Sequence, residues 1–157
     1  MSTFKASEMF QIAMRIEENG ERLYRHAVNL TDDAKMKDMF GFVADEETKH
    51  RKTFEGMLSK IEDYQPPERY PGEYFAYLKA YAENVVFPPE RMERELAKIT
   101  DVDGALEFAI QREIESILYY IEAKGFVPEN QRDAIDEIIA EERKHYLKLT
   151  EIKRSLD

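Results

Sequence analysis

The chain has 157 residues, a formal net charge of −10 and no cysteine. This length fits one domain, residues 1–157, with a sizeable core, and the acidic balance argues against nucleic acid or an anionic membrane as a partner. The lack of cysteine excludes disulfides and thiolate metal sites. No apolar run approaches the ~20 residues of a membrane span, and the N-terminus lacks the apolar core of a signal peptide. We therefore expect a soluble, cytoplasmic protein.

Apolar residues that recur in steps of three and four predict an all-α fold with four long helices. The predicted ranges are residues 4–30, 32–61, 103–124 and 128–155. Their seams are heptad-like, which favours the near-parallel packing of a four-helix bundle. Thr31, Asp32 and Asp33 predict an N-cap with acids in the first turn, while Gly125 and Pro128 mark the boundary between the last two helices.

Residues 62–102 form a long crossover, rich in Pro, Tyr and Phe, between the second and third long helices. Short helices are predicted near 73–84 and 90–98, the second beginning at Pro89. A helix of ~29 residues spans about 44 Å, so a segment of this length can return the chain to the opposite end of the bundle. We expect its aromatic residues to cover an apolar face or to form a dimer contact; transfer of electrons from an external donor is the alternative.

Two Glu-x-x-His motifs lie on the apolar seams of the second and fourth long helices. Each is preceded by a further seam Glu on the helix before it, at separations of 30 residues (Glu17 to Glu47) and 29 residues (Glu113 to Glu142). The candidate metal ligands are therefore Glu17, Glu47, His50, Glu113, Glu142 and His145.

The two halves of the chain repeat one another around these residues. Ala13, Glu17, Tyr24 and Ala27 recur 96 positions later as Ala109, Glu113, Tyr120 and Ala123. The pattern Glu-Glu-x-Lys-His at 46–50 recurs at 141–145, an offset of 95. Such a repeat predicts a pseudo-two-fold axis through a central site. It also makes the second and third long helices parallel, which is why a long crossover is needed.

An ionised carboxylate in a core costs several kcal/mol unless a counter-charge is supplied, and the Lys and Arg residues are expected on the outer faces. Glu and His at positions i and i+3 share one helix face and can hold one cation. Four carboxylates with two imidazoles predict a dinuclear site for iron or manganese, with zinc chemically possible. Without metal, the carboxylates should repel one another and take up protons. Glu18, Glu46 and Glu141, about 100° round their helices, are expected to face water.

Two small residues occupy equivalent seam positions, Gly20 and Ser116, each between a candidate ligand and its tyrosine. Because glycine inside a helix costs up to ~1 kcal/mol relative to alanine, a reason for it is expected. We hypothesise that both leave space beside the metals for O2 or peroxide; close helix–helix approach is the alternative. His26, close to the opposite helix face from Glu17, is expected at the surface.

This pattern resembles the ferritin-like di-iron superfamily, and most closely its rubrerythrin-like branch, over all four long helices. The resemblance implies that Glu17 and Glu113 are terminal ligands, that Glu47 and Glu142 bridge the metals, and that His50 and His145 are terminal. It implies a pair of irons, oxo- or hydroxo-bridged when oxidised. Tyr24 and Tyr120 match tyrosines that hydrogen-bond the ligands in that family.

The function implied by the resemblance is reduction of hydrogen peroxide or O2 in defence against oxidative stress. The chain lacks the cysteine-bearing rubredoxin domain of typical rubrerythrins, so an external donor such as a rubredoxin-like protein is expected. Ser116 also replaces the extra Glu of the peroxidase-type members. The alternatives are a ferroxidase or iron-handling protein, a di-manganese catalase-like enzyme, and a non-catalytic metal-binding helical module. A homodimer is expected from the family and the aromatic crossover.

Overall fold

The computed structural model describes residues 6–61 and 72–156, and every regular element in these ranges is helical. Six α-helices and one short 3-10 turn follow in chain order: α1 (Ala6–Val28), α2 (Ala34–Leu58), α3 (Gly72–Val85), α4 (Pro89–Lys98), α5 (Val102–Ala123), η1 (Lys124–Phe126) and α6 (Glu129–Leu156). The predicted helices are confirmed, with ends that differ by a few residues. Prolines 66, 67 and 71 of the crossover lie outside the described residues.

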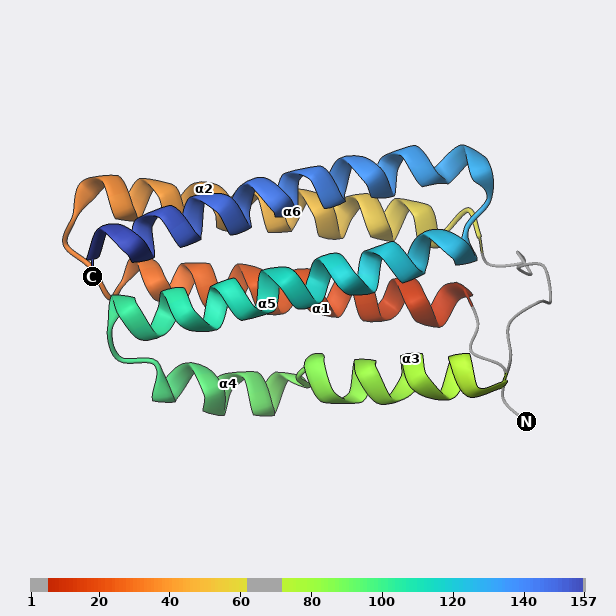
Figure 1. Cartoon of the computed structure of the whole chain (residues 1–157), viewed down its shortest axis with the longest axis horizontal. Coiled ribbons are helices and arrows are strands. Elements are labelled where there is room, and N and C mark those ends of the chain that lie inside the picture. The colour runs from red at the N-terminus through yellow and green to blue at the C-terminus, as the bar shows by residue number, and fades with distance from the viewer. Residues whose placement is uncertain (1–5, 62–71, 157) are drawn as a thin grey trace.

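Helices α1, α2, α5 and α6 lie side by side as a four-helix bundle (Figure 1). The pairs α1–α2 and α5–α6 are antiparallel and pack most extensively, α1 also packs against α5, and α2 contacts α6. Helices α3 and α4 follow one another along the outside of α1 and α5, so that α2 and α5 run in the same direction, as predicted. No described helix is long and apolar enough to cross a membrane.

The helix ends follow from local hydrogen bonding. Asp33 is the N-cap of α2, and its carboxylate accepts a hydrogen bond of 2.9 Å from the amide of Met36. Asp32 and Asp33 therefore precede the first turn of α2, and the prediction that they lie within that turn is wrong. Pro89 begins α4, as expected for a residue whose missing N–H is not needed there. Gly125 lies within η1, just past the end of α5 at Ala123, which agrees with the predicted helix boundary, although no described glycine has a positive φ.

Two apolar clusters fill the bundle, one at each end. The first includes Phe10, Phe54, Tyr120 and Ile135, and the second includes Leu23, Phe40, Leu106 and Leu149. Crossover side chains join both clusters, so this segment does cover an apolar face of the bundle. Along each long helix the candidate ligands lie between a residue of one cluster and a residue of the other. The acids therefore form one polar layer between two apolar ones.

The cap of α2 can be tested by mutation. Asp33→Ala removes the acceptor for the Met36 amide and is expected to lower the free energy of unfolding by about 1 kcal/mol. Asp32→Ala, at the exposed neighbouring position, is the control and should change stability little. Chemical denaturation of the three proteins measures both effects. Equal losses from the two substitutions would contradict the assignment of the cap.

Candidate metal centre

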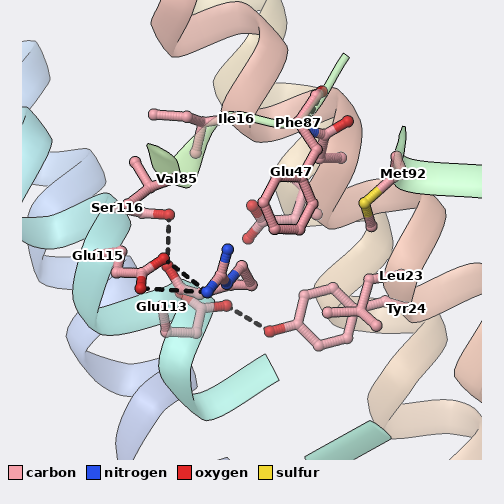
Figure 2. Close-up of a pocket in the computed structure, with 13 residues that line it drawn as sticks. Ile16, Leu23, Tyr24, Glu47, Val85, Phe87, Met92, Glu113, Glu115 and Ser116 are labelled. Atoms are coloured by element: carbon pink, nitrogen blue, oxygen red, sulfur yellow. Dashed lines mark hydrogen bonds and ion pairs between the residues drawn. The ribbon is translucent and has the colours of Figure 1, made fainter. Parts of the chain in front are cut away.

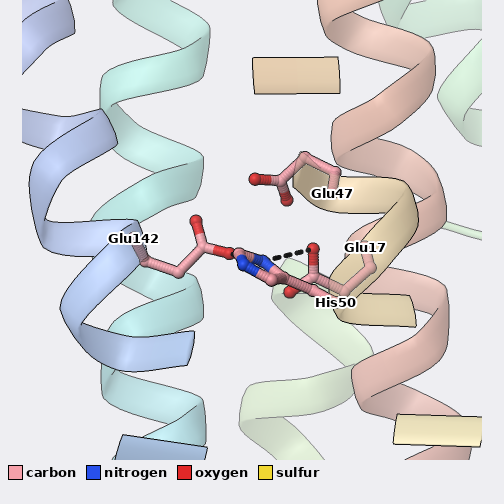
Figure 3. Close-up of side chains that lie close together, drawn as sticks. All are labelled: Glu17, Glu47, His50 and Glu142. Carbon is pink, nitrogen blue, oxygen red and sulfur yellow. Dashed lines mark hydrogen bonds and ion pairs between the residues drawn. The ribbon is translucent and has the colours of Figure 1, made fainter. Parts of the chain in front are cut away.

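The structure brings all six predicted ligands together in the middle of the bundle. Their exposed fractions lie between 0% and 4%: Glu17, Glu47, His50, Glu113, Glu142 and His145. They form two groups in which one ligand atom from each residue lies within 4.8 Å of the others. One group contains Glu17 and His50 (Figure 3), the other contains Glu113 and His145, and both contain Glu47 and Glu142. Two adjacent four-residue groups that share two carboxylates are the arrangement that a pair of bridged metal ions requires.

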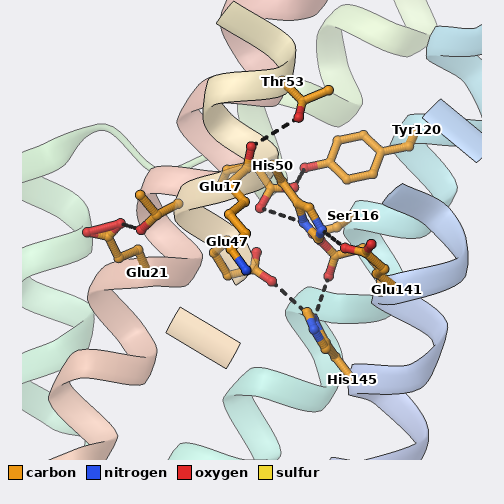
Figure 4. A network of polar contacts seen from close by, with 12 residues as sticks. Glu17, Glu21, Glu47, His50, Thr53, Ser116, Tyr120, Glu141 and His145 are labelled. Atoms are coloured by element: carbon orange, nitrogen blue, oxygen red, sulfur yellow. Dashed lines mark hydrogen bonds and ion pairs between the residues drawn. The ribbon is translucent and has the colours of Figure 1, made fainter. Parts of the chain in front are cut away.

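Both histidines turn Nδ1 toward the carboxylates (Figure 4). Nδ1 of His50 lies 2.8 Å from Oε1 of Glu142 and 3.5 Å from Oε2 of Glu17. Nδ1 of His145 lies 3.1 Å from Oε1 of Glu47 and 3.3 Å from Oε2 of Glu142. Glu142 therefore faces both imidazoles, and each imidazole offers the same ring atom to the centre.

The pKa values show the cost of this burial. Burial and the charges of neighbouring carboxylates raise the pKa of Glu17, Glu47 and Glu113 well above the ordinary value. Burial also tends to raise the pKa of Glu142. Hydrogen bonds with Glu113 and with both imidazoles outweigh this effect and hold the pKa of this carboxyl well below its ordinary value. Burial lowers the pKa of His50, yet its hydrogen bond with Glu142 and the nearby acidic charges raise it to about 9. The metal-free cluster therefore competes for protons.

The residues fit a pair of divalent cations. Four carboxylates face two imidazoles, and buried Oε2 of Glu113 has no hydrogen-bond partner within the described part of the chain. Carboxylate oxygens with imidazole nitrogens, and no sulfur, suit iron or manganese. Two divalent ions would supply the positive charge that the three carboxyls with raised pKa values otherwise obtain from protons.

The two tyrosines that the resemblance singled out reach across the bundle. The hydroxyl of Tyr24 on α1 donates to Oε1 of Glu113 on α5 at 2.5 Å. The hydroxyl of Tyr120 on α5 donates to Oε1 of Glu17 on α1 at 2.6 Å. Each bond leaves the second oxygen of the same carboxylate for the cluster. The two hydrogen bonds are related by the pseudo-two-fold repeat. They orient the carboxylates of Glu113 and Glu17, the outer carboxylates of the cluster.

One acid predicted to face water, Glu141, also contacts the centre. Glu141 keeps a side chain that is 41% exposed, but its Oε2 lies 2.5 Å from Nε2 of His50. Glu46 joins these two residues in a third, partly buried group. The expectation for Glu141 is therefore met only in part: the half-exposed carboxylate also reaches across from α6 to α2, which helix phase alone does not reveal. The signal available was the repeated Glu-Glu pair at 46–47 and 141–142.

The imidazole of His145, which the repeat makes equivalent to that of His50, has different surroundings. Nε2 of His145 is buried and has no hydrogen-bond partner among the residues that the structure describes. Because a ligating histidine usually donates its second N–H to a carboxylate or carbonyl, His50 alone has the usual support. His26, expected at the surface, is also placed differently: it is partly buried, and its Nε2 lies 2.8 Å from the carbonyl oxygen of Ile99.

A cavity of about 30 Å³ lies against the centre (Figure 2). It is lined by apolar side chains of the bundle and crossover, by Glu47 and Glu113, and by both small residues, Gly20 and Ser116. A Cβ at position 20 would lie 2.9 Å from Oε2 of Glu47, so this glycine gives room to a carboxylate rather than to another helix. Ser116 donates to the carbonyl oxygen of Arg112 at 2.8 Å. Space beside the ligands is therefore present.

Two polar residues of the cavity wall were not anticipated. Arg112, expected on an outer face, is partly buried: it pairs with Glu115 at 3.0 Å and lies 5.0 Å from the ring centre of Phe87. Its Nε and Nη1, and Oδ1 of Asn19, are buried without hydrogen-bond partners in the described ranges. Periodicity did not reveal them, because the crossover residues that enclose this side are distant in sequence.

An all-α bundle with a carboxylate and histidine layer between two apolar clusters defines a ferritin-like di-iron-type protein. A family model described as Rubrerythrin matches residues 8–153, and the chain belongs to this family. No curated protein matches the chain. A crystal structure from Thermotoga maritima, provisionally described as a ferritin-like diiron-carboxylate protein, matches with 28% identity and a TM-score of 0.71. The match covers 98% of this chain and 97% of that one.

The stability of the metal-free protein should depend on pH. A group whose pKa is raised by folding stabilises the fold below its unfolded pKa, and this contribution is lost as the pH rises through the folded pKa. For His50 that window runs from 6.5 to about 9, and the three raised carboxyls act in the same direction. Calorimetry with a chelator present should show Tm falling by several degrees across the window. Metal-loaded protein should show a smaller change, and a rising Tm without metal would contradict the prediction.

The room that Gly20 provides can also be tested. In Gly20→Ala the Cβ displaces the carboxylate of Glu47, and because a flexible side chain can turn aside, the fold should survive while metal affinity falls by about 10–100-fold. In the control, Gly56→Ala, an added Cβ meets no described atom within 4 Å outside its own helix backbone and chain neighbours. The control should gain about 0.5–1 kcal/mol and keep its metals. Metal titration followed by denaturation measures both outcomes, and equal affinity in the two variants would contradict the role of Gly20.

Proposed function

We propose that the chain is a di-iron redox protein that reduces hydrogen peroxide, or O2, at this centre with electrons from an external donor. The observation that carries the proposal is the pair of buried four-residue groups that share Glu47 and Glu142. Membership of the Rubrerythrin family supports iron as the metal. When bound, two irons supply two electrons to the O–O bond of the oxidant.

Each ligand has a proposed role. Glu47 and Glu142 would hold both metals, because these two residues belong to both four-residue groups. Glu17 with His50, and Glu113 with His145, complete one metal each. Tyr24 and Tyr120 hold the two outer carboxylates in place through their hydroxyl hydrogen bonds. Reduction of one peroxide consumes two electrons and two protons and releases two waters.

The cavity favours a small polar oxidant. About 30 Å³ holds one or two molecules the size of water and is far below the several hundred Å³ of sites for organic substrates. Its wall contains donors on Arg112 and an acceptor on Asn19 without hydrogen-bond partners among the described residues. Hydrogen peroxide both donates and accepts hydrogen bonds, whereas O2 is a poor partner for either. We therefore propose peroxide as the preferred oxidant.

Metal content and oxidant kinetics test the proposal together. Protein loaded anaerobically with iron(II) should bind two irons per chain, and peroxide should oxidise them faster than it oxidises free iron. The variant Glu47→Ala/Glu142→Ala should lose the irons, because it removes both shared carboxylates. Arg112→Leu should raise the peroxide concentration needed for half-maximal rate and leave oxidation by O2 nearly unchanged.

The remaining alternatives give different results in the same experiments. Repeated turnover with excess iron(II), and mineral retained on the protein, would identify a ferroxidase. Two manganese ions and peroxide dismutation without a reductant would identify a catalase-like enzyme. Bound metal that reacts with neither oxidant would leave a structural site and contradict the proposal.

A further inference from the structure

A row of tyrosines leads from one candidate ligand to the surface. Tyr120, which donates to Glu17, contacts Tyr119 with ring centres 6.2 Å apart. Tyr119 stacks on Tyr81 of α3 at 6.3 Å with ring planes 8° apart, and Tyr81 contacts Tyr77 at 6.3 Å. Tyr77 is 54% exposed. All three separations lie within the range of direct aromatic contact.

The hydroxyl partners divide these four residues into two kinds. A phenol that loses an electron must also lose its proton, so it needs a proton acceptor. Tyr120 has one in the carboxylate of Glu17, and exposed Tyr77 has water. The hydroxyls of Tyr119 and Tyr81 donate instead to the backbone carbonyls of Met9 (3.1 Å) and Glu115 (2.6 Å), which do not take up protons.

Among the residues that the structure describes, the other half of the pseudo-two-fold centre has no such row. Tyr24 makes the equivalent hydrogen bond to Glu113, but within the described ranges its ring contact is with Phe40, which is not readily oxidised. The difference arises because α3 lies along one side of the bundle (Figure 1). The chain therefore contains its own control: two tyrosines with the same ligand contact, of which one is linked to the surface.

We propose that Tyr77, Tyr81, Tyr119 and Tyr120 form an electron relay between a one-electron donor protein at the surface near Tyr77 and the metal centre. Tyr120 and Tyr77 are the residues that change oxidation state, and the rings of Tyr119 and Tyr81 connect them. This inference rests on the proposed redox function, but it assigns a path and a point of electron delivery that the function itself does not require.

The transfer balances in electrons and protons. Tyr120 gives one electron to the centre, and its phenolic proton moves along the 2.6 Å hydrogen bond to Glu17. Tyr77 then gives one electron through the two intervening rings and loses its proton to water, while the proton on Glu17 returns to Tyr120. A reduced donor protein restores Tyr77 with one electron, and water returns the proton. Two such passes supply the two electrons that one peroxide consumes.

The relay can be followed without measuring turnover. Iron-loaded protein is treated with several equivalents of hydrogen peroxide and no reductant, so that peroxide in excess of the two electrons held by the irons must draw electrons from the tyrosines. A nitrone spin trap is present, and the adduct is located by peptide mass spectrometry. Electron paramagnetic resonance of frozen samples records the tyrosyl radical. In the wild type and in Tyr24→Phe the adduct should form at Tyr77. In Tyr120→Phe it should fall at least several-fold, although this variant loses the same kind of ligand hydrogen bond as Tyr24→Phe.

The intervening rings have a matched pair of variants. Tyr81→Phe keeps the ring and should keep the adduct at Tyr77, whereas Tyr81→Leu removes the ring and should reduce it several-fold. Metal content and circular dichroism confirm that each variant is folded and loaded. The Glu47→Ala/Glu142→Ala variant with an equal concentration of free iron measures oxidation of Tyr77 from solution.

The outcomes separate the relay from the proposed function. Iron that peroxide leaves in the ferrous state would overturn both. If peroxide oxidises the iron but the adduct at Tyr77 does not exceed the level in the free-iron control, the relay alone is overturned. An equal adduct in Tyr120→Phe and Tyr24→Phe, or in Tyr81→Leu and Tyr81→Phe, would also overturn it.

Discussion

Mutual repulsion among four buried carboxylates is the constraint on which the rest of the structure depends. Glu17, Glu47, Glu113 and Glu142 are at most 4% exposed, and two imidazoles are their nearest cationic partners. Such a layer is tolerated only if protons or metal ions neutralise it. The bundle accommodates it by placing an apolar cluster on either side, so that burial of hydrophobic side chains offsets the cost of the charged layer.

The centre is nearly symmetric, but its surroundings are not. The repeat gives each half a Glu, a Glu-x-x-His and a tyrosine that crosses to the opposite carboxylate. Helices α3 and α4 of the crossover lie along one side of the bundle (Figure 1). On that side the crossover supplies part of the cavity wall, with Val85, Phe87 and Met92 (Figure 2), and the outer half of the tyrosine row. The two metal positions thus share a ligand set and differ in access. The proposed oxidant site and the proposed electron relay both use this difference.

The departures from typical members of the family fit together. The sequence has no cysteine, which fits the external electron donor that we propose. Peroxidase-type members of the family carry a further Glu at the position of Ser116. In this chain Ser116 borders the cavity, and its hydroxyl donates a hydrogen bond to the carbonyl oxygen of Arg112. A small side chain at this position lines the same cavity as Arg112 and Asn19, in place of a seventh candidate ligand.

The sequence by itself determined the four long helices, the crossover and the candidate ligands, because each depends on spacing along one helix and on a repeat that can be counted. Residues whose roles depend on contacts between helices were decided by the tertiary structure. Helix phase places Glu141 toward the solvent, yet its carboxylate also reaches His50 on another helix. Arg112, which periodicity did not single out, lies in the cavity wall beside Phe87 of the crossover. Gly20 was identified as unusual, but only the position of Glu47 explains it. Periodicity fixes which face a residue occupies; what that face meets is decided by packing between segments distant in sequence.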